Sequence, residues 1–389
     1  MALLGAIVVL TYLFTPAGCV TSKTMETFLV NCSGIGYPLV PCILGSDIEQ
    51  LDLSHNNIKI IQQQNFQSLT KLKILFLQFN QISEIEPESF AKNRELQYLD
   101  LSNNFLRVIS ALPFNHLQSL THLDITNNRF KTANLGAKIS KLQKLHTLRF
   151  GNTWLSSLNS SSLFPLRGIP LQEMYLITGE LQTYEPGTLK VLQSMEKLSL
   201  DLQFGQQPQL LINIFKDIPM TTTTLQILNT DFVKYGKDID LFFPLKKSNI
   251  LSLIVQNITT DDSSTAHLFN SVLGSNMEEL YLSTIKLNGI GRWNIQTVSA
   301  EKINVRKVSI IDVFDDKKDS LILLLLEPIP KNSIPDRFCK LRKLMNKNTY
   351  LEWPQNEFQQ GFFWKRLKAV LNLDFHSCCI LEESIKGAN

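Results

Sequence analysis

Hydrophobic residues recur early in the chain in a fixed order that repeats every 24 residues. Each copy has the form L-x-x-L-x-L-x-x-N-x-L, with Ile or Phe in place of some leucines. The first copy runs from Ile48 to Ile58, and later copies begin at Leu72, Leu96 and Leu120. A period of this size predicts a solenoid, in which every unit lays one short strand beside the next. Such an array offers a binding surface rather than an active site.

Two polar or aromatic positions of each unit have structural roles. The asparagine at the ninth position can hydrogen-bond backbone groups that the strand pairing does not reach. These asparagines are Asn56, Asn80, Asn104 and Asn128. Phenylalanines follow at the same spacing, at Phe66, Phe90 and Phe114, and should pack beneath the convex side. These units have the pattern of leucine-rich repeats, and we assign these positions no binding function.

The pattern loosens after Phe130, where seven weaker units bring the total to about eleven between residues 48 and 313. Thr153 and Gly179 stand where the asparagine is expected. Its loss should relax the turn and alter the local curvature. Irregular repeats of this kind can open a gap in the core, or they can reflect drift without function. The weaker units begin at Leu145, Leu171, Met195, Leu225, Ile250, Met277 and Val305.

The N-terminal segment predicts entry into the secretory pathway. Residues 1–22 have a short apolar run and small residues for cleavage, as a signal peptide does, but lack a charged start, so an uncleaved anchor is the alternative. Residues 23–47 would then form an N-terminal cap. We expect a Cys32–Cys42 disulfide to close this cap over the open end of the core, with two unpaired thiols as the alternative.

Three N-x-[ST] sequons, at Asn31, Asn159 and Asn257, favour the same route and predict glycosylation. The longest later apolar run is Leu321–Leu326, which is far too short to span a membrane. We therefore expect this chain to be extracellular.

Composition narrows the class of function. The chain has 389 residues, 44% of them hydrophobic and 19% charged, as a folded protein does. A net charge of +3 gives no electrostatic reason to expect nucleic-acid binding. Six scattered histidines, with no nucleophile elbow, phosphate loop or metal-spaced cluster, predict a protein that is not an enzyme and needs no metal or cofactor.

Residues 314–374 have a different character. A charged break is followed by an apolar strand at Leu321–Leu326, a helix at Asp336–Met345, a strand at Thr349–Trp353 and a helix at Glu357–Leu373. This order predicts a fragment of an α/β sheet, with the first strand buried. We assign no role to the tail, residues 375–389.

Two resemblances become specific at particular segments. Residues 30–313 resemble about the N-terminal half of a Toll-like receptor ectodomain, most clearly at Tyr184–Lys190, Asn229–Phe232 and Leu287–Gly291. Residues 314–374 resemble the C-terminal half of a flavodoxin-like Toll/interleukin-1 receptor (TIR) domain. The matching segments are Leu323–Pro330, Arg337–Lys347 and Thr349–Pro354, and Phe363 and Trp364 match the family's box 3. The expected fold is therefore α/β, a leucine-rich-repeat horseshoe followed by a partial TIR domain.

The resemblance implies an innate-immune pattern-recognition receptor of the plasma membrane that senses microbial lipopeptides or lipoproteins. It also implies heterodimers with related receptor ectodomains and a TIR adaptor inside the cell. In that family a convex-side pocket between central and C-terminal repeats takes the acyl chains. The segments that match one wall are apolar, and the repeats of the opposite wall have no counterpart here. The candidate wall residues are Leu253, Val255, Ile258, Leu280, Leu282, Leu287, Val308 and Ile310.

The sequence also departs from the family. We find no counterpart of box 1, of box 2 with its adaptor-recruiting loop, or of the transmembrane helix. We therefore expect no signalling, with a soluble decoy or a non-functional truncated product as the alternatives. A half domain should also leave one edge of the strand at Leu321–Leu326 unpaired, which favours aggregation.

Overall fold

The computed structural model describes residues 18–23, 28–42, 45–204, 207–235, 239–273, 275–288, 307–315, 323–325 and 350–352. It divides into two units, Met1–Leu202 and Gln203–Asn389. The predicted helices at 336–345 and 357–373, the box 3 residues Phe363 and Trp364, and the tail lie outside the described residues. Within those residues, no helix is both long enough and apolar enough to cross a bilayer.

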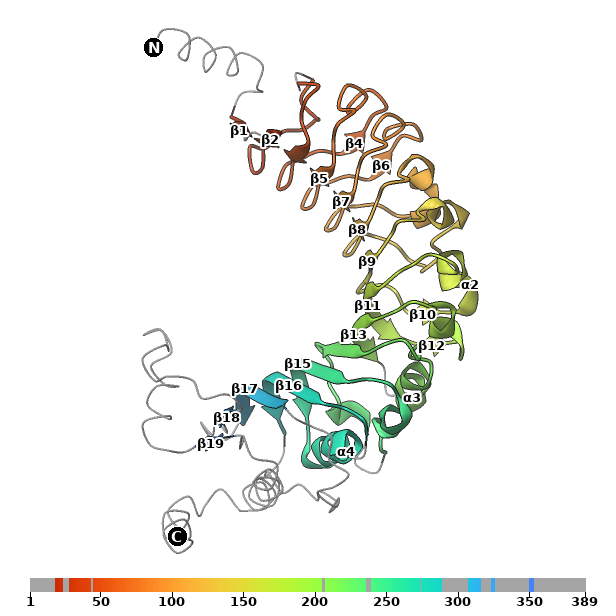
Figure 1. The fold of residues 1–389 in the computed structure, drawn as a ribbon, viewed down its shortest axis with the longest axis vertical. Helices are drawn as coiled ribbons and strands as arrows, with labels where there is room; N and C mark the ends of the chain where they lie inside the picture. The colour runs from red at the N-terminus through yellow and green to blue at the C-terminus, as the bar shows by residue number, and fades with distance from the viewer. Residues whose placement is uncertain are drawn as a thin grey trace, which may run out of the picture. The chain divides into compact units, whose positions relative to one another are not determined.

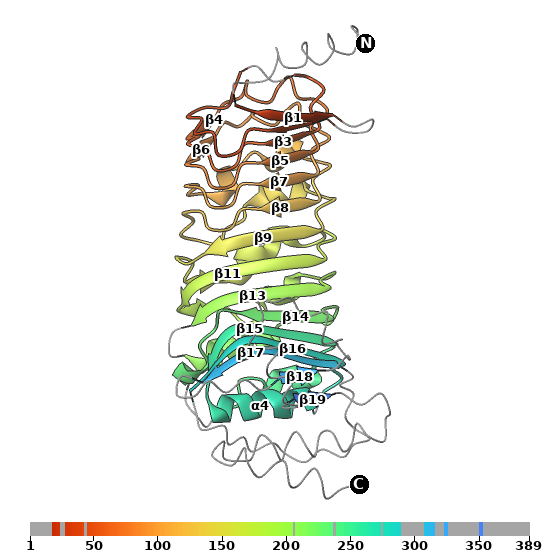
Figure 2. The same cartoon turned by 90° about the vertical axis from the view of Figure 1, so that its left-hand side faces the viewer.

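The first unit is built on a sheet that is parallel after its first pair of strands (Figures 1 and 2). β1 (Val20–Lys23) runs antiparallel to β2 (Phe28–Asn31), and β2 is parallel to β3 (Gln50–Asp52). The sheet continues with β5 (Ile74–Phe76), β7 (Tyr98–Asp100), β8 (His122–Asp124), β9 (Thr147–Asn152), β11 (Glu173–Leu181) and β13 (Lys197–Phe204).

Short elements lie on the opposite side of this unit, where Figure 1 places β4, β6, β10, β12 and α2. Two small parallel pairs form there, β4 (Ile60–Ile61) with β6 (Glu84–Ile85) and β10 (Ser157–Leu158) with β12 (Thr183–Tyr184). The helical turns are η1 (Ile109–Ala111), η2 (Phe114–His116), η3 (Ala137–Lys141), α2 (Ser160–Leu163), η4 (Phe164–Leu166) and η5 (Thr188–Val191).

The core of the first four repeats confirms the predicted pattern. Every motif position predicted to point inward is at most 2% exposed, because alternate residues of a strand point to opposite faces. The predicted phenylalanine row is also buried, and the rings of Phe66 and Phe90 stack with their centroids 5.9 Å apart. This continuous apolar filling is what joins units that could not fold alone.

The asparagines bond the backbone where the chain leaves the strand, as predicted. Asn80 Nδ2 donates to the carbonyl oxygens of Leu53 (2.9 Å) and Leu77 (3.1 Å), and its Oδ1 accepts the N–H of Ile58 (3.0 Å). The residue before each asparagine is left-handed, with φ between 54° and 56°. These left-handed residues are His55, Phe79, Asn103 and Asn127. Each turn is therefore held by one side chain that reaches two successive repeats.

Strands lengthen where the asparagine is lost. β3, β5, β7 and β8 have three residues each, whereas β9 has six and β11 has nine. Pairing of β9 with β11 continues to Asn152 and Thr178, so the neighbouring strand satisfies the backbone groups that the asparagine otherwise bonds. Gly151 allows this approach, because a Cβ there would lie 1.9 Å from the carbonyl oxygen of Ile177. Where a relaxed turn was predicted, the structure therefore has a longer strand.

The second unit repeats this longer form. Its parallel strands are β14 (Thr224–Leu228), β15 (Ser252–Thr260), β16 (Glu279–Leu287) and β17 (Lys307–Asp315). Among the described residues, its helices and helical turns are α3 (Pro208–Lys216), η6 (Val233–Tyr235), η7 (Phe243–Lys247) and α4 (Asp262–Leu273). Left-handed Asn257 and Thr284 lie within β15 and β16. The next residues, Ile258 and Ile285, are buried in the asparagine position.

Both strands predicted beyond residue 314 are present, as β18 (Leu323–Leu325) and β19 (Tyr350–Glu352). β18 is parallel to β19 and antiparallel to β17, with Ile310 opposite Leu324. The prediction of an unpaired edge for this strand is therefore wrong, because β17 and β19 occupy its two edges. β17 itself extends to Asp315, two residues beyond the predicted end of the repeats.

Candidate functional site

The sheet of the first unit presents rows of side chains opposite its core. The side chains on either side of the inward residues of β3, β5, β7, β8, β9, β11 and β13 point outward. We call these outward side chains, which include Asp201, the sheet face. Strand register places one row of it across five strands. From β5 to β11 this row consists of Phe76, Asp100, Asp124, Arg149 and Tyr175, and Asp52 of β3 lies opposite Phe76. It is acidic and aromatic with a single arginine, so it is suited to recognition rather than to catalysis.

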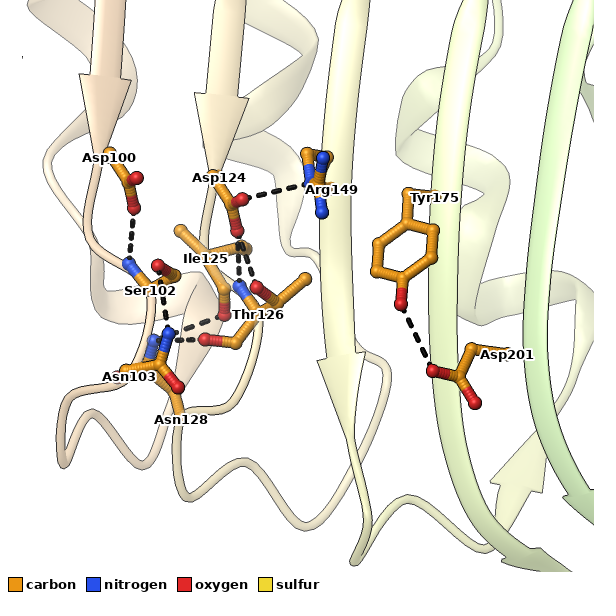
Figure 3. Close-up of polar contacts among 10 residues, drawn as sticks. All are labelled: Asp100, Ser102, Asn103, Asp124, Ile125, Thr126, Asn128, Arg149, Tyr175 and Asp201. Atoms are coloured by element: carbon orange, nitrogen blue, oxygen red, sulfur yellow. Dashed lines mark hydrogen bonds and ion pairs between the residues drawn. The ribbon is translucent and has the colours of Figure 1, made fainter. Parts of the chain in front are cut away.

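Arg149 links two neighbours in this row (Figure 3). Its Nε lies 3.0 Å from Asp124 Oδ2, and its guanidinium carbon lies 4.5 Å from the centre of the Tyr175 ring. The Tyr175 hydroxyl donates to Asp201 Oδ2 at 3.0 Å. Burial, followed by the charge of Asp201, holds the pKa of Tyr175 far above its usual range, so the hydroxyl remains a donor.

Asp100 lies one strand from Asp124 and has a different environment. Its Oδ1 accepts the N–H of Ser102 at 2.9 Å. Burial, and then the charge of Asp124, raise the pKa of the Asp100 carboxyl, while Ser102 and Arg149 oppose the rise. The negative charge of the Asp100 carboxylate is therefore only partly offset by Ser102 and Arg149.

The repeat motif alone does not predict this row, because its variable positions have the pattern of spacers between the inward residues. The available signal was the recurrence of charged or aromatic residues at one position, from Phe76 to Tyr175.

The predicted pocket wall lies in the second unit. Leu253, Val255, Ile258, Leu280 and Leu282 are at most 3% exposed and belong to the core. The backbones of Val308 and Ile310 pair with Leu280 and Leu282, which continues the same rows, and Leu287 ends β16 opposite Thr260. The side chains of Leu287, Val308 and Ile310 lie outside the described part of the structure. A role for these residues in lining a pocket remains a prediction.

The disulfide differs from the prediction. Cys32 is bonded to Cys19, and Cys42 is exposed with a free thiol. The antiparallel pairing of β1 with β2 places Val20 opposite Asn31, which brings the preceding and following cysteines together with their Cα atoms 4.3 Å apart. The predicted Cys32–Cys42 bridge is therefore wrong in the structure. β1 crosses the expected boundary between residues 22 and 23, and that boundary remains a prediction.

All three sequon asparagines are exposed. Asn159 caps α2, where its Oδ1 accepts the N–H of Ser162 at 3.0 Å. Asn257 Nδ2 donates to Asn229 Oδ1 at 2.6 Å. Asn31 Oδ1 accepts from the N–H and hydroxyl of Ser33. Glycosylation of all three remains a prediction. Among the described residues, no group of three or more His, Cys, Asp or Glu side chains is placed to hold a metal ion.

Comparison with known families first defines the class. The leucine-rich-repeat family model matches residues 46–106 and 94–149, so this part of the chain consists of leucine-rich repeats. The matched stretch is the one with the regular asparagines.

More particular similarities are to Toll-like receptor 2 over a short stretch. Toll-like receptor 2 type-2 of Gallus gallus is 61% identical over 59 residues, which are 15% of this chain and 8% of the relative. Toll-like receptor 2 of Capra hircus is 59% identical over 59 residues, with the same coverages. The match thus spans less than a tenth of these relatives.

A solved structure described as a TLR13–ssRNA13 complex has a TM-score of 0.47 and 17% identity, covering 71% of this chain and 41% of that one. This likeness is too low to assign a ligand.

Proposed function

We propose that this chain is a recognition protein of the Toll-like receptor type, a class of innate-immune pattern-recognition receptor. The observation that carries the proposal is a leucine-rich-repeat core that leaves an acidic and aromatic sheet face outside. The local identity of 59–61% with Toll-like receptor 2 supports the type. Sequons at exposed asparagines favour an extracellular location.

The family-implied ligands are microbial lipopeptides or lipoproteins, and we propose the rows through Leu253, Leu280 and Val308 as one wall of their pocket. An apolar pocket binds because it removes most of the ligand's surface from water. One wall would leave acyl chains wet, so we expect no measurable affinity. Titration calorimetry of the secreted protein with a triacylated lipopeptide tests this, and saturable binding would show that the wall is sufficient.

We also propose that this chain does not signal by itself, because its sequence has no counterpart of box 1 or of box 2. The TIR adaptor is a partner that the resemblance implies for full-length family members only. Expression in cells that lack the full receptor tests this, and a ligand-dependent reporter response would contradict it. A matched cell line given the full receptor is the control.

A second candidate function is a soluble decoy that binds a microbial ligand or a related receptor ectodomain. The apolar N-terminal segment and the sequons favour this function. The alternative is a truncated product without function, which applies if the join near Phe314 is an artefact of the gene. Sequencing the transcript across residues 305–320 separates the two. Co-precipitation of the tagged protein with related Toll-like receptor ectodomains tests the decoy directly, and capture of none of them would exclude that form.

A further inference from the structure

One arginine of the chain itself, Arg149, already packs on the sheet face. Arg149 lies between the carboxylate of Asp124 and the ring of Tyr175, at 3.0 Å and 4.5 Å respectively (Figure 3). A guanidinium suits such a position because it can pair with a carboxylate along its edge while its flat face covers an aromatic ring. This arrangement shows which chemistry the sheet face accommodates.

The neighbouring strands repeat these parts, but among the described residues no arginine or lysine pairs with or covers them. The ring of His122 stacks on that of Tyr98, with the centroids 5.8 Å apart. Asp100 supplies the carboxylate, and Phe76 is its partner in register on β5. Tyr98 lies two residues before Asp100 on the same face, with its ring centre 5.2 Å from that of Phe76. All three side chains are half-buried, so each keeps an exposed surface. We call these three residues the Asp100 niche.

The Asp100 niche lacks the compensation that Arg149 gives Asp124. Among the described residues, the one polar contact of the Asp100 carboxylate is with Ser102. Arg149 pairs with Asp124 rather than with Asp100. The carboxylate of Asp124 also places a second negative charge on the strand beside Asp100. A half-buried carboxylate without a cation is partly desolvated and uncompensated, and a cation supplied from outside would reduce that penalty.

The charge of the sheet face points to the same occupant. Its acidic residues outnumber its basic ones, although the whole chain has a net charge of +3. The acidic residues are Asp52, Asp100, Asp124, Glu173 and Asp201, and the basic ones are Arg149 and Lys197. A sheet face with this excess of negative charge attracts basic partners and repels acidic ones.

We propose that the Asp100 niche binds an arginine side chain from a basic segment of a partner protein. The guanidinium pairs with Asp100 and covers the rings of Phe76 and Tyr98, as Arg149 does with Asp124 and Tyr175. Arginine is preferred to lysine, because a compact ammonium cannot cover a ring and pair with a carboxylate with the same geometry. This site lies in the first unit and goes beyond the lipopeptide pocket proposed for the second.

Fluorescence anisotropy of the secreted full chain tests the niche, with a labelled oligoarginine peptide and an oligolysine peptide of equal length at low salt. We expect oligoarginine to bind more tightly. Asp100→Asn and Phe76→Leu should each weaken its binding by roughly tenfold. Arg149→Ala should strengthen it, because that variant vacates a second site of the same kind.

Asp47→Asn is the matched control, since Asp47 is exposed, pairs with Lys71 and lies outside the sheet face. Thermal melting of each variant separates a lost contact from a lost fold. Equal affinity for the two peptides, or equal weakening by Asp47→Asn and Asp100→Asn, would overturn the proposal in favour of diffuse electrostatic attraction. Calorimetry with lipopeptide reports separately on the pocket, so the two proposals can fail independently.

Discussion

Asn104 Nδ2 donates to the carbonyl oxygen of Leu77, a residue of the preceding repeat, at 2.9 Å. The same amide reaches Leu101, and Asn104 Oδ1 accepts the N–H of Ile82. Asn104→Ala should therefore leave buried backbone groups unsatisfied and lower the free energy of unfolding by about 2–3 kcal/mol. Chemical denaturation measures this. Asn115→Ala, at an exposed asparagine, should cost much less, and equal costs would show that the bridging bonds contribute little.

Gly151 and Gly168 both have positive φ, but only Gly151 faces a neighbouring strand. Gly168→Ala should cost about 1–2 kcal/mol, the ordinary penalty for a left-handed alanine. Gly151→Ala should cost more than about 3 kcal/mol, because its Cβ would collide with the Ile177 carbonyl and separate β9 from β11. Secretion yield and denaturation midpoint measure both, and similar effects would contradict the close approach of these strands.

The cysteines of the cap should differ in reactivity. Alkylation of the folded, unreduced protein followed by peptide mapping should label Cys42 but neither Cys19 nor Cys32, because the latter two are bonded to each other. Cys32→Ser should make Cys19 reactive and leave Cys42 unchanged. Labelling of Cys19 together with protection of Cys42 in the unaltered protein would restore the Cys32–Cys42 pairing. N-terminal sequencing should find Cys19 retained after any processing.

Asn159 is both a sequon asparagine and the cap of α2. Ser161→Ala removes the sequon and keeps the cap, so it should remove one glycan with little change in stability. Asn159→Gln should remove the glycan and also about 1 kcal/mol of stability, the usual value of an N-cap. Gel mobility after glycosidase treatment and thermal melting measure the two effects. Unchanged mobility in both variants would show that this sequon is not used.

The raised pKa of Asp100 predicts a pH dependence. The folded state holds the Asp100 proton more tightly than the unfolded state does, because burial and Asp124 disfavour the charge. The ionised carboxylate therefore destabilises the fold above its pKa, and the penalty disappears as pH falls through that pKa. Asp100→Asn should be more stable than the unaltered protein at neutral pH, with the difference shrinking in acid.

Asp124→Asn provides the contrast, because it loses the ion pair with Arg149 and should be less stable at neutral pH. Denaturation midpoints across the acid range measure both variants. A constant difference between Asp100→Asn and the unaltered protein at all pH values would contradict the assignment of the penalty to the charge.

The regular repeats could be read from the sequence because each one is local. An inward leucine such as Leu75 and a turn asparagine such as Asn80 are fixed by spacing within a few residues, and the same solution recurs at the next copy. The long β15 and β16 were less evident, because an isoleucine in the asparagine position indicates lost capping but not what replaces it. The replacement is extended pairing with the next strand, which is a contact between distant residues.

What the sequence by itself determined is the solenoid, its inward residues and the role of its asparagines, since these follow from a short periodic pattern. Only the tertiary structure decided the partner of Cys32, the pairing of β18 with β17, and the row from Phe76 to Tyr175. Each of these depends on which strand lies beside which and in what register. Side chains more than 20 residues apart, such as Asp124 and Arg149, become neighbours through that register alone.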